Sequence, residues 1–164
     1  MLAGGGPADV VDLTIALAET MCELSGVDAD PAAVLASGAA MDVWNKMVAA
    51  QGGDHTATLR RAHQIEQIRA TETGRLSALD ARKIGEAAWR LGAGRARKED
   101  SVSEAAGVVW HAIPGDEVTK GHVLFELHAD DADRIPPAVE AIQGAERYGD
   151  TLEDDHPLIL ERIG

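Results

Sequence analysis

The sequence predicts an α+β protein in which helices form the N-terminal part and short strands dominate the rest. Apolar residues recur at three- and four-residue steps over residues 7–50, which is typical of amphipathic helices. From residue 62 onward, apolar and polar residues alternate over short stretches bounded by Gly, Pro and Asp, which indicates strands and turns. We therefore expect two parts, residues 1–61 and residues 62–164, with residues 54–61 as a linker.

Three helices are expected in the first part, over residues 7–25, 31–38 and 39–50. Asp30 caps the second helix and Pro31 occupies its first position. One face of the first helix is apolar throughout, and it carries Val10, Leu13, Leu17, Met21 and Leu24. So much apolar surface on so short a segment would pack poorly alone. We expect these helices to be the end of a larger α/β domain.

The second part is expected to alternate between strands and helices. Asp80 caps a helix whose inner face carries Ile84, Ala87, Ala88 and Leu91. Pro114 and Gly115 mark a turn, and residues 118–121 and 123–128 are expected to pair as a hairpin. Another helix is expected over residues 133–145, with Pro136 and Pro137 in its first turn. Strands are expected at residues 64–70, 75–79, 107–113 and 158–160.

Composition excludes several classes of function. The formal net charge of -13 argues against nucleic-acid binding, which needs basic patches to neutralise phosphates. The chain has one cysteine, Cys22, and therefore no internal disulfide. It contains no apolar run of the roughly 18 residues that a membrane span requires. The first residues lack the basic and apolar regions of a signal peptide, so a cytoplasmic protein is expected.

Residues 91–100, with the sequence LGAGRARKED, place a basic loop on this acidic chain. One interpretation is structural: Gly92 ends the helix that precedes it, and the cations are solvated. The other is functional: the cations face an anion while the two glycines permit a close backbone approach. Glu99 and Asp100 stand beside two of the cations and can neutralise them in place. The residues concerned are Gly92, Gly94, Arg95, Arg97 and Lys98.

Four motifs resemble one enzyme family in the same order along the chain. They are AGGGPADV at residues 3–10, MVAAQGGD at residues 47–54, LGAGRARKED at residues 91–100 with AAGVVWH following at residues 105–111, and PLILERI at residues 157–163. Together they resemble the C-terminal part of the thymidine and pyrimidine-nucleoside phosphorylases. The resemblance implies a pentosyltransferase that splits thymidine with phosphate as co-substrate, without a cofactor, as a homodimer.

The resemblance also implies where the catalytic residues are not. The phosphate site of this family uses a K-x-S motif, which is absent here, so no catalytic residue is expected in this stretch. The N-terminal catalytic portion would hold the nucleoside and the phosphate. The family's C-terminal domain helps the cleft to close, and by resemblance the closure loop is residues 93–102, with Arg95 as its gate.

Residues 107–128 also resemble the hairpin of biotinyl and lipoyl carrier domains. Asp131 stands where a carrier has its modified lysine, and a carboxylate cannot form the amide to biotin or lipoate. A barrel-sandwich hairpin is therefore expected without the carrier function. His111 and His128 on neighbouring strands could meet, but no metal site is expected, because no histidine pair has helical ligand spacing. The alternative function is a binding or scaffolding module that docks on a separate catalytic chain.

Overall fold

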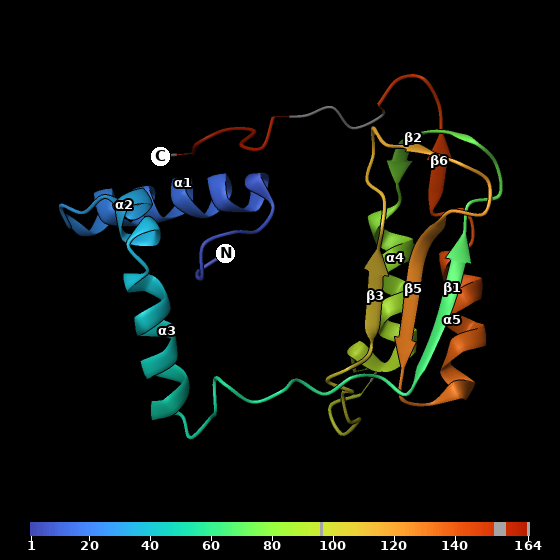
Figure 1. Cartoon of the computed structure of the whole chain (residues 1–164), viewed down its shortest axis with the longest axis horizontal. Coiled ribbons are helices and arrows are strands. Elements are labelled where there is room, and N and C mark those ends of the chain that lie inside the picture. The colour runs from blue at the N-terminus through green and yellow to red at the C-terminus, as the bar shows by residue number, and fades with distance from the viewer. Residues whose placement is uncertain (96, 153–156, 164) are drawn as a thin grey trace. The chain divides into compact units, whose positions relative to one another are not determined.

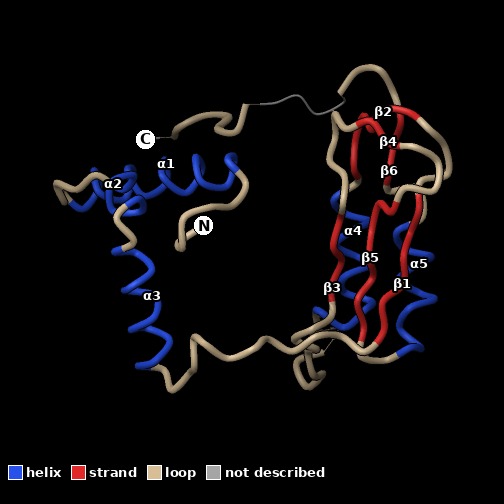
Figure 2. The backbone as a smooth tube through the Cα atoms, in the orientation of Figure 1, coloured by secondary structure: helices blue, strands red, loops and turns tan. Residues whose placement is uncertain are grey.

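The computed structural model describes residues 1–95, 97–152 and 157–163. The chain divides into two compact units, one formed by residues 1–58 and 156–164 and the other by residues 59–155. The first unit is helical and the second contains helices and strands, so the predicted α+β class is confirmed. Figure 1 labels the helices α1–α5 and most of the strands, and Figure 2 also labels β4. Within the described residues, no helix combines the length and apolarity required to cross a membrane.

The three predicted helices of the first unit are confirmed as α1 (Ala8–Ser25), α2 (Pro31–Ala36) and α3 (Ala39–Ala50). Gly26 ends α1 in the left-handed region, at a φ of 69°. The Asp30 carboxylate caps α2 by accepting a hydrogen bond of 3.0 Å from the Ala33 amide. None of the three helices contains a buried residue. Their apolar faces therefore remain largely exposed among the described residues.

The predicted strand at residues 158–160 is wrong. Residues 157–163 have no regular secondary structure, because the described part of their unit contains only helices and offers no strand for pairing. Arg162 instead forms an ion pair with Glu23 of α1. Between α1 and residues 158–163 lies a groove of about 590 Å³.

The second unit contains two small antiparallel sheets and two helices. The first sheet has the order β1–β5–β3, with β1 at Gln64–Arg69, β5 at Val123–Ala129 and β3 at Gly107–Trp110. The second has the order β4–β2–β6, with β4 at Glu117–Val118, β2 at Gly74–Leu79 and β6 at Glu146–Tyr148. The helices α4 (Ala81–Ala88) and α5 (Ile135–Ile142) pack against each other on one side of the β1–β5–β3 sheet (Figures 1 and 2).

The predicted hairpin of residues 118–121 with residues 123–128 is wrong. β4 pairs with β2, where Gly74 lies opposite Val118, whereas β5 lies between β1 and β3. Gly121, at a φ of 90°, turns the chain between the two strands. Its amide donates to the Ala70 carbonyl at 2.9 Å, and the Ala70 amide donates back to His122 at 2.8 Å. The turn is thus fixed to the end of β1, and β4 is free to join the other sheet.

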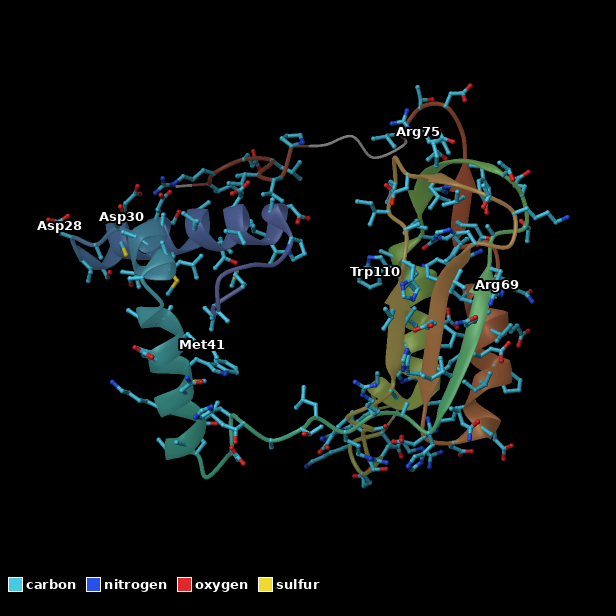
Figure 3. The ribbon with its side chains drawn as sticks, viewed as in Figure 1. Asp28, Asp30, Met41, Arg69, Arg75 and Trp110 are labelled. Atoms are coloured by element: carbon cyan, nitrogen blue, oxygen red, sulfur yellow. The ribbon has the colours of Figure 1, made fainter. Side chains whose placement is uncertain are left out.

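The core of the second unit lies where the sheets meet α4 and α5. It is mostly aliphatic, as the 3% aromatic content of the chain requires. Arg75 ties two loops at its edge: its guanidinium donates to the Gly115 carbonyl at 3.2 Å and to the Asp150 carbonyl at 3.3 Å (Figure 3). The largest fully buried side chains are Leu76, Leu91, Leu124, Phe125, Leu127 and Ile142.

Candidate functional site

The candidate site is the basic loop that follows α4. Asp80 caps this helix as predicted, and its carboxylate accepts bonds of 3.0 Å and 3.1 Å from the Arg82 and Lys83 amides. The chain then widens into a π-helical turn at Trp89–Ala93. Ala87 and Leu91 of the predicted inner face are buried, whereas Trp89 is 44% exposed. The loop therefore leaves from a helix end that is anchored in the core.

Gly92 and Gly94 are required for different reasons. Gly92 is buried and has a φ of 107°, a conformation that side chains with a Cβ rarely adopt. Gly94 has an ordinary extended backbone with a φ of −138°. A Cβ at Gly94 would lie only 3.0 Å from Cδ1 of Trp89. The first glycine thus permits the turn that ends the helix, and the second permits the indole to lie against the backbone.

The three cations of the loop are exposed. Within residues 1–95, 97–152 and 157–163, no ion pair links Arg95, Arg97 or Lys98 to a carboxylate. The expected neutralisation in place by Glu99 and Asp100 is therefore not observed among the described residues. Asp100 instead caps a tight turn, where its carboxylate accepts a 2.8 Å hydrogen bond from the Arg97 amide. Ala96, within the predicted loop, lies outside the described residues.

Arg90 differs from these cations because it is already paired. Its guanidinium donates to Glu86 Oε1 at 2.7 Å and 3.1 Å, one helical turn earlier. A cation paired in this way near the C-terminal end of a helix stabilises that end. Arg90 and Arg95 are close in sequence, yet only Arg90 has a carboxylate partner among the residues that the structure describes.

The loop is closed at its base by Ser103. The Ser103 amide donates to the Gly92 carbonyl at 2.9 Å, and its hydroxyl donates to Asp130 Oδ2 at 2.5 Å. Arg60 Nη2 lies 3.0 Å from the same Asp130 oxygen. The hydrogen bond from Ser103 lowers the pKa of Asp130, and the charges of Arg60 and His63 add to the effect. Sequence reasoning missed this cluster, because the three segments that contribute to it are 27 or more residues apart along the chain.

A cavity of about 410 Å³ adjoins the base of the loop. It has charged and hydroxyl groups on its walls and backbone from the helix end at Gly92. Its lining includes Arg60, Gly92, Ser101, Asp130 and Arg134. The Arg134 guanidinium donates to the Arg90 carbonyl at 3.4 Å, so its charge is held over the end of the helix.

The place of a carrier domain's lysine is occupied by a helix cap. β5 ends at Ala129, and the Asp131 carboxylate accepts a 3.0 Å hydrogen bond from the Asp133 amide. It thereby caps the 3₁₀ turn η2 (Ala132–Arg134) that leads into α5. Asp131 has a structural role here, and it offers no amine for attachment of a prosthetic group.

His111 and His128 come together on the sheet face opposite the helices. Nε2 of each lies 3.5 Å from Oε2 of Glu126. Gln67 on β1 donates to Glu126 Oε1 at 3.1 Å. This hydrogen bond is the main cause that lowers the pKa of Glu126, and the two histidines contribute. Among the described residues, no group of three or more His, Cys, Asp or Glu side chains has the geometry to hold a metal ion.

Comparison with known proteins shows which family this chain is similar to. Residues 75–149 match the family described as the pyrimidine nucleoside phosphorylase C-terminal domain. The chain is 43% identical over 164 residues to a thymidine phosphorylase of Mycobacterium tuberculosis, across 99% of this chain and 38% of that protein. It is 31% identical over 175 residues to a pyrimidine-nucleoside phosphorylase of Staphylococcus aureus, across 98% of this chain and 40% of that protein. The chain therefore spans less than half the length of these curated relatives.

Proposed function

We propose that this chain, which belongs to the thymidine and pyrimidine-nucleoside phosphorylase family as its C-terminal portion, closes the active site of a complete phosphorylase. The reaction would be the reversible phosphorolysis of thymidine. A phosphate oxygen forms a bond to the anomeric carbon, and the bond from that carbon to the base breaks. The base leaves with the bonding electron pair and takes up a proton. The products are thymine and 2-deoxyribose 1-phosphate.

The observation that carries this role is the exposed guanidinium of Arg95, which forms no ion pair within the part of the chain that the structure describes. An exposed guanidinium without a carboxylate partner among the described residues, on a chain with a formal net charge of -13, is suited to a dianion. The loop that presents it is flanked by glycines at one end and fixed by Ser103 at the other. Closure of such a loop over bound phosphate would exclude water, which competes with phosphate as the nucleophile.

The first unit would dock on the catalytic portion. Its apolar side chains support this, because Met21 is 69% exposed and Leu24 is 83% exposed on the face that the periodicity predicts to be buried. On α3, Val43 is 64% exposed and Trp44 is 45% exposed. Exposed faces of this kind mark interaction surfaces. We place the division between docking and closing parts at residues 1–61 and 62–164.

The second unit would be a reduced relative of the barrel-sandwich fold. In support, β3 and β5 pair antiparallel with Val108 opposite Leu127, and the segment between them contains the turn at Pro114 and Gly115. Each sheet has three strands, and α4 and α5 complete the core. From family membership we further propose that the complete enzyme is a cytoplasmic homodimer. Light scattering on the complete enzyme would test its dimeric state.

The decisive experiment is alanine substitution in a complete enzyme that carries this sequence. Arg95→Ala should lower kcat/KM by on the order of tenfold or more, because a charge-assisted hydrogen bond contributes about 1.5–3 kcal/mol. The fold should be equally stable, since Arg95 is exposed. Arg97→Ala and Lys98→Ala should lose less, because by resemblance Arg95 is the gate. Steady-state kinetics and thermal melting on the same variants provide both readouts.

Arg90→Ala is the matched control. It removes a guanidinium that already has Glu86 as a partner, so kcat/KM should hold while the melting temperature falls slightly. Equal kinetics in Arg95→Ala and wild type would leave the loop as ordinary solvated surface.

The alternative is a scaffolding module that docks on a separately encoded catalytic chain, and the same exposed helix faces support it. One measurement separates the two possibilities, and a second tests the premise that they share. The intact mass of the natural protein shows whether a catalytic portion is covalently attached. Thymine release by the pure 164-residue chain is expected to stay at background under both, because the K-x-S motif is absent. Turnover by this chain alone would contradict both.

A further inference from the structure

Asp130 is the point at which three separate segments meet. The segment that enters β1 contributes Arg60, whose Nη2 lies 3.0 Å from Asp130 Oδ2. The end of the basic loop contributes Ser103, whose hydroxyl donates to the same oxygen at 2.5 Å. Asp130 itself follows directly after β5, the central strand of its sheet. One carboxylate oxygen therefore joins the incoming linker and the loop to the end of the central strand of this sheet.

The second oxygen of this carboxylate, Oδ1, is buried and can accept a further hydrogen bond. Among the described residues, Asp130 Oδ1 makes no hydrogen bond of full geometry, although the backbone amide of His63 contributes to the lowered pKa of Asp130. Nδ1 of His63 lies 3.8 Å from this oxygen, which is beyond hydrogen-bond range. Oδ2 thus lies near Arg60 and Oδ1 lies near His63, and Oδ2 also accepts the hydrogen bond from Ser103 at the base of the loop.

We propose that Asp130 is a positioning residue that couples the linker to the closure loop. The proposal rests on the closure role proposed above, and it adds the residue that links movement of the loop to movement of the linker. When residues 59–63, where the linker leads into β1, change position, Arg60 displaces the Asp130 carboxylate with which it is paired, and Asp130 is in turn bonded to Ser103. The loop can then respond through Asp130 to a change at the linker. Asp130 touches no substrate in this scheme and is not a catalytic residue.

Charge and position favour coupling over simple structural support. The Asp130 side chain is 21% exposed, so its ion pair is screened less than one at the open surface. The Arg60 side chain, in contrast, is 51% exposed and lies in a segment without regular structure. The Ser103 amide also donates to the Gly92 carbonyl, so the two ends of the loop are joined to each other by a contact that does not involve Asp130. Asp130 therefore acts on a preformed loop base.

The test is ¹⁵N relaxation on the 164-residue chain, which reports backbone order residue by residue and needs no activity. In the wild type, Arg60, His63 and Ser103 should be ordered. Asp130→Ala should lower the order parameters of residues 59–63 and 97–103 together, to below about 0.6, the range of flexible backbone. Asp130→Asn keeps an acceptor for Ser103 but lacks the charge that attracts Arg60. Compared with Asp130→Ala, it should therefore restore the order parameters of residues 97–103 more than those of residues 59–63.

Two single substitutions probe the coupling without altering Asp130. Ser103→Ala should loosen residues 59–63, and Arg60→Ala should loosen residues 97–103, although neither residue belongs to the segment that responds. These crossed effects would not arise if Asp130 only supported each segment locally. If Asp130→Ala fails to fold, these two variants still test whether Asp130 couples the two segments.

Asp131→Ala is the matched control, because it removes the neighbouring carboxylate, which caps η2. Its effect should be confined to residues 132–135. Loosening of only one segment in Asp130→Ala, absence of the crossed effects, or equal changes in Asp131→Ala would overturn the proposal. Since the readout is order in this chain, such a result would leave the proposed phosphorylase role to be judged by the Arg95 kinetics.

Discussion

At the residue scale, the glycines of the loop show how one side chain determines where a helix ends. Gly92→Ala forces a Cβ into a backbone with a φ of 107° and should destabilise the second unit by roughly 1–3 kcal/mol. Gly85→Ala is the matched control: this glycine lies inside α4, is exposed, and has open space at its Cβ position. It should stabilise by about 0.5–1 kcal/mol. Hydrogen exchange of the β5 amides measures both, and a loss of protection in Gly85→Ala would contradict this account.

The Glu126 carboxylate predicts a pH dependence of unfolding. Its pKa is lowered from 4.5 in the folded chain, chiefly by the hydrogen bond from Gln67. The ionised form is thus favoured by folding, so its contribution is present above about pH 4.5 and is lost as the pH falls through the lowered pKa. Glu126→Gln should be less stable than wild type at neutral pH, and the difference should vanish in acid. Urea unfolding at several pH values measures this difference, and a difference that is constant with pH would contradict the stabilisation of the ionised Glu126 carboxylate.

At the element scale, helix capping separates the stabilities of the two units. Asp80→Ala removes the acceptor for two amides of α4, which packs on the core, and should cost about 1 kcal/mol in the second unit. Asp30→Ala removes the same kind of cap from α2 in the first unit. It should leave the exchange of β5 amides unchanged. Loss of β5 protection in Asp30→Ala would mean that the units unfold together.

Local signals predicted the elements, whereas pairing depended on distant residues. The helices α1, α2 and α3 follow from periodicity, caps and glycines within a few residues and are confirmed, although α2 ends at Ala36, two residues before its predicted end. The partner of β4 could not be predicted, because it depends on bonds between the turn at residues 119–122 and Ala70. β6 was missed because three residues are too few for an alternating pattern. The loop itself was visible as two glycines and three cations, but its anchor at Asp130 requires three segments that only the fold brings together.

At the scale of the whole molecule, the chain has a core in one unit and uncovered apolar faces in the other. All thirteen apolar residues of its buried core cluster belong to residues 70–145, and none lies in α1, α2 or α3. A unit of three short helices without a buried residue gains little free energy from packing on itself. Its stability in the complete protein therefore depends on the surface that it contacts, which in our proposal is the catalytic portion.

Leu17→Glu tests this dependence. Leu17 is 58% exposed on the apolar face of α1, and covering a leucine side chain contributes about 1.5–3 kcal/mol. The substitution should weaken binding of this chain to a separately produced catalytic portion by roughly tenfold or more, as measured by titration calorimetry. Ile65→Glu is the matched control, because Ile65 is similarly exposed at 54% but lies on β1, outside the proposed docking face. Its affinity should equal that of the wild type. Equal weakening by both substitutions would show that the apolar face of α1 is not the docking surface, and that the catalytic portion is held elsewhere on the chain.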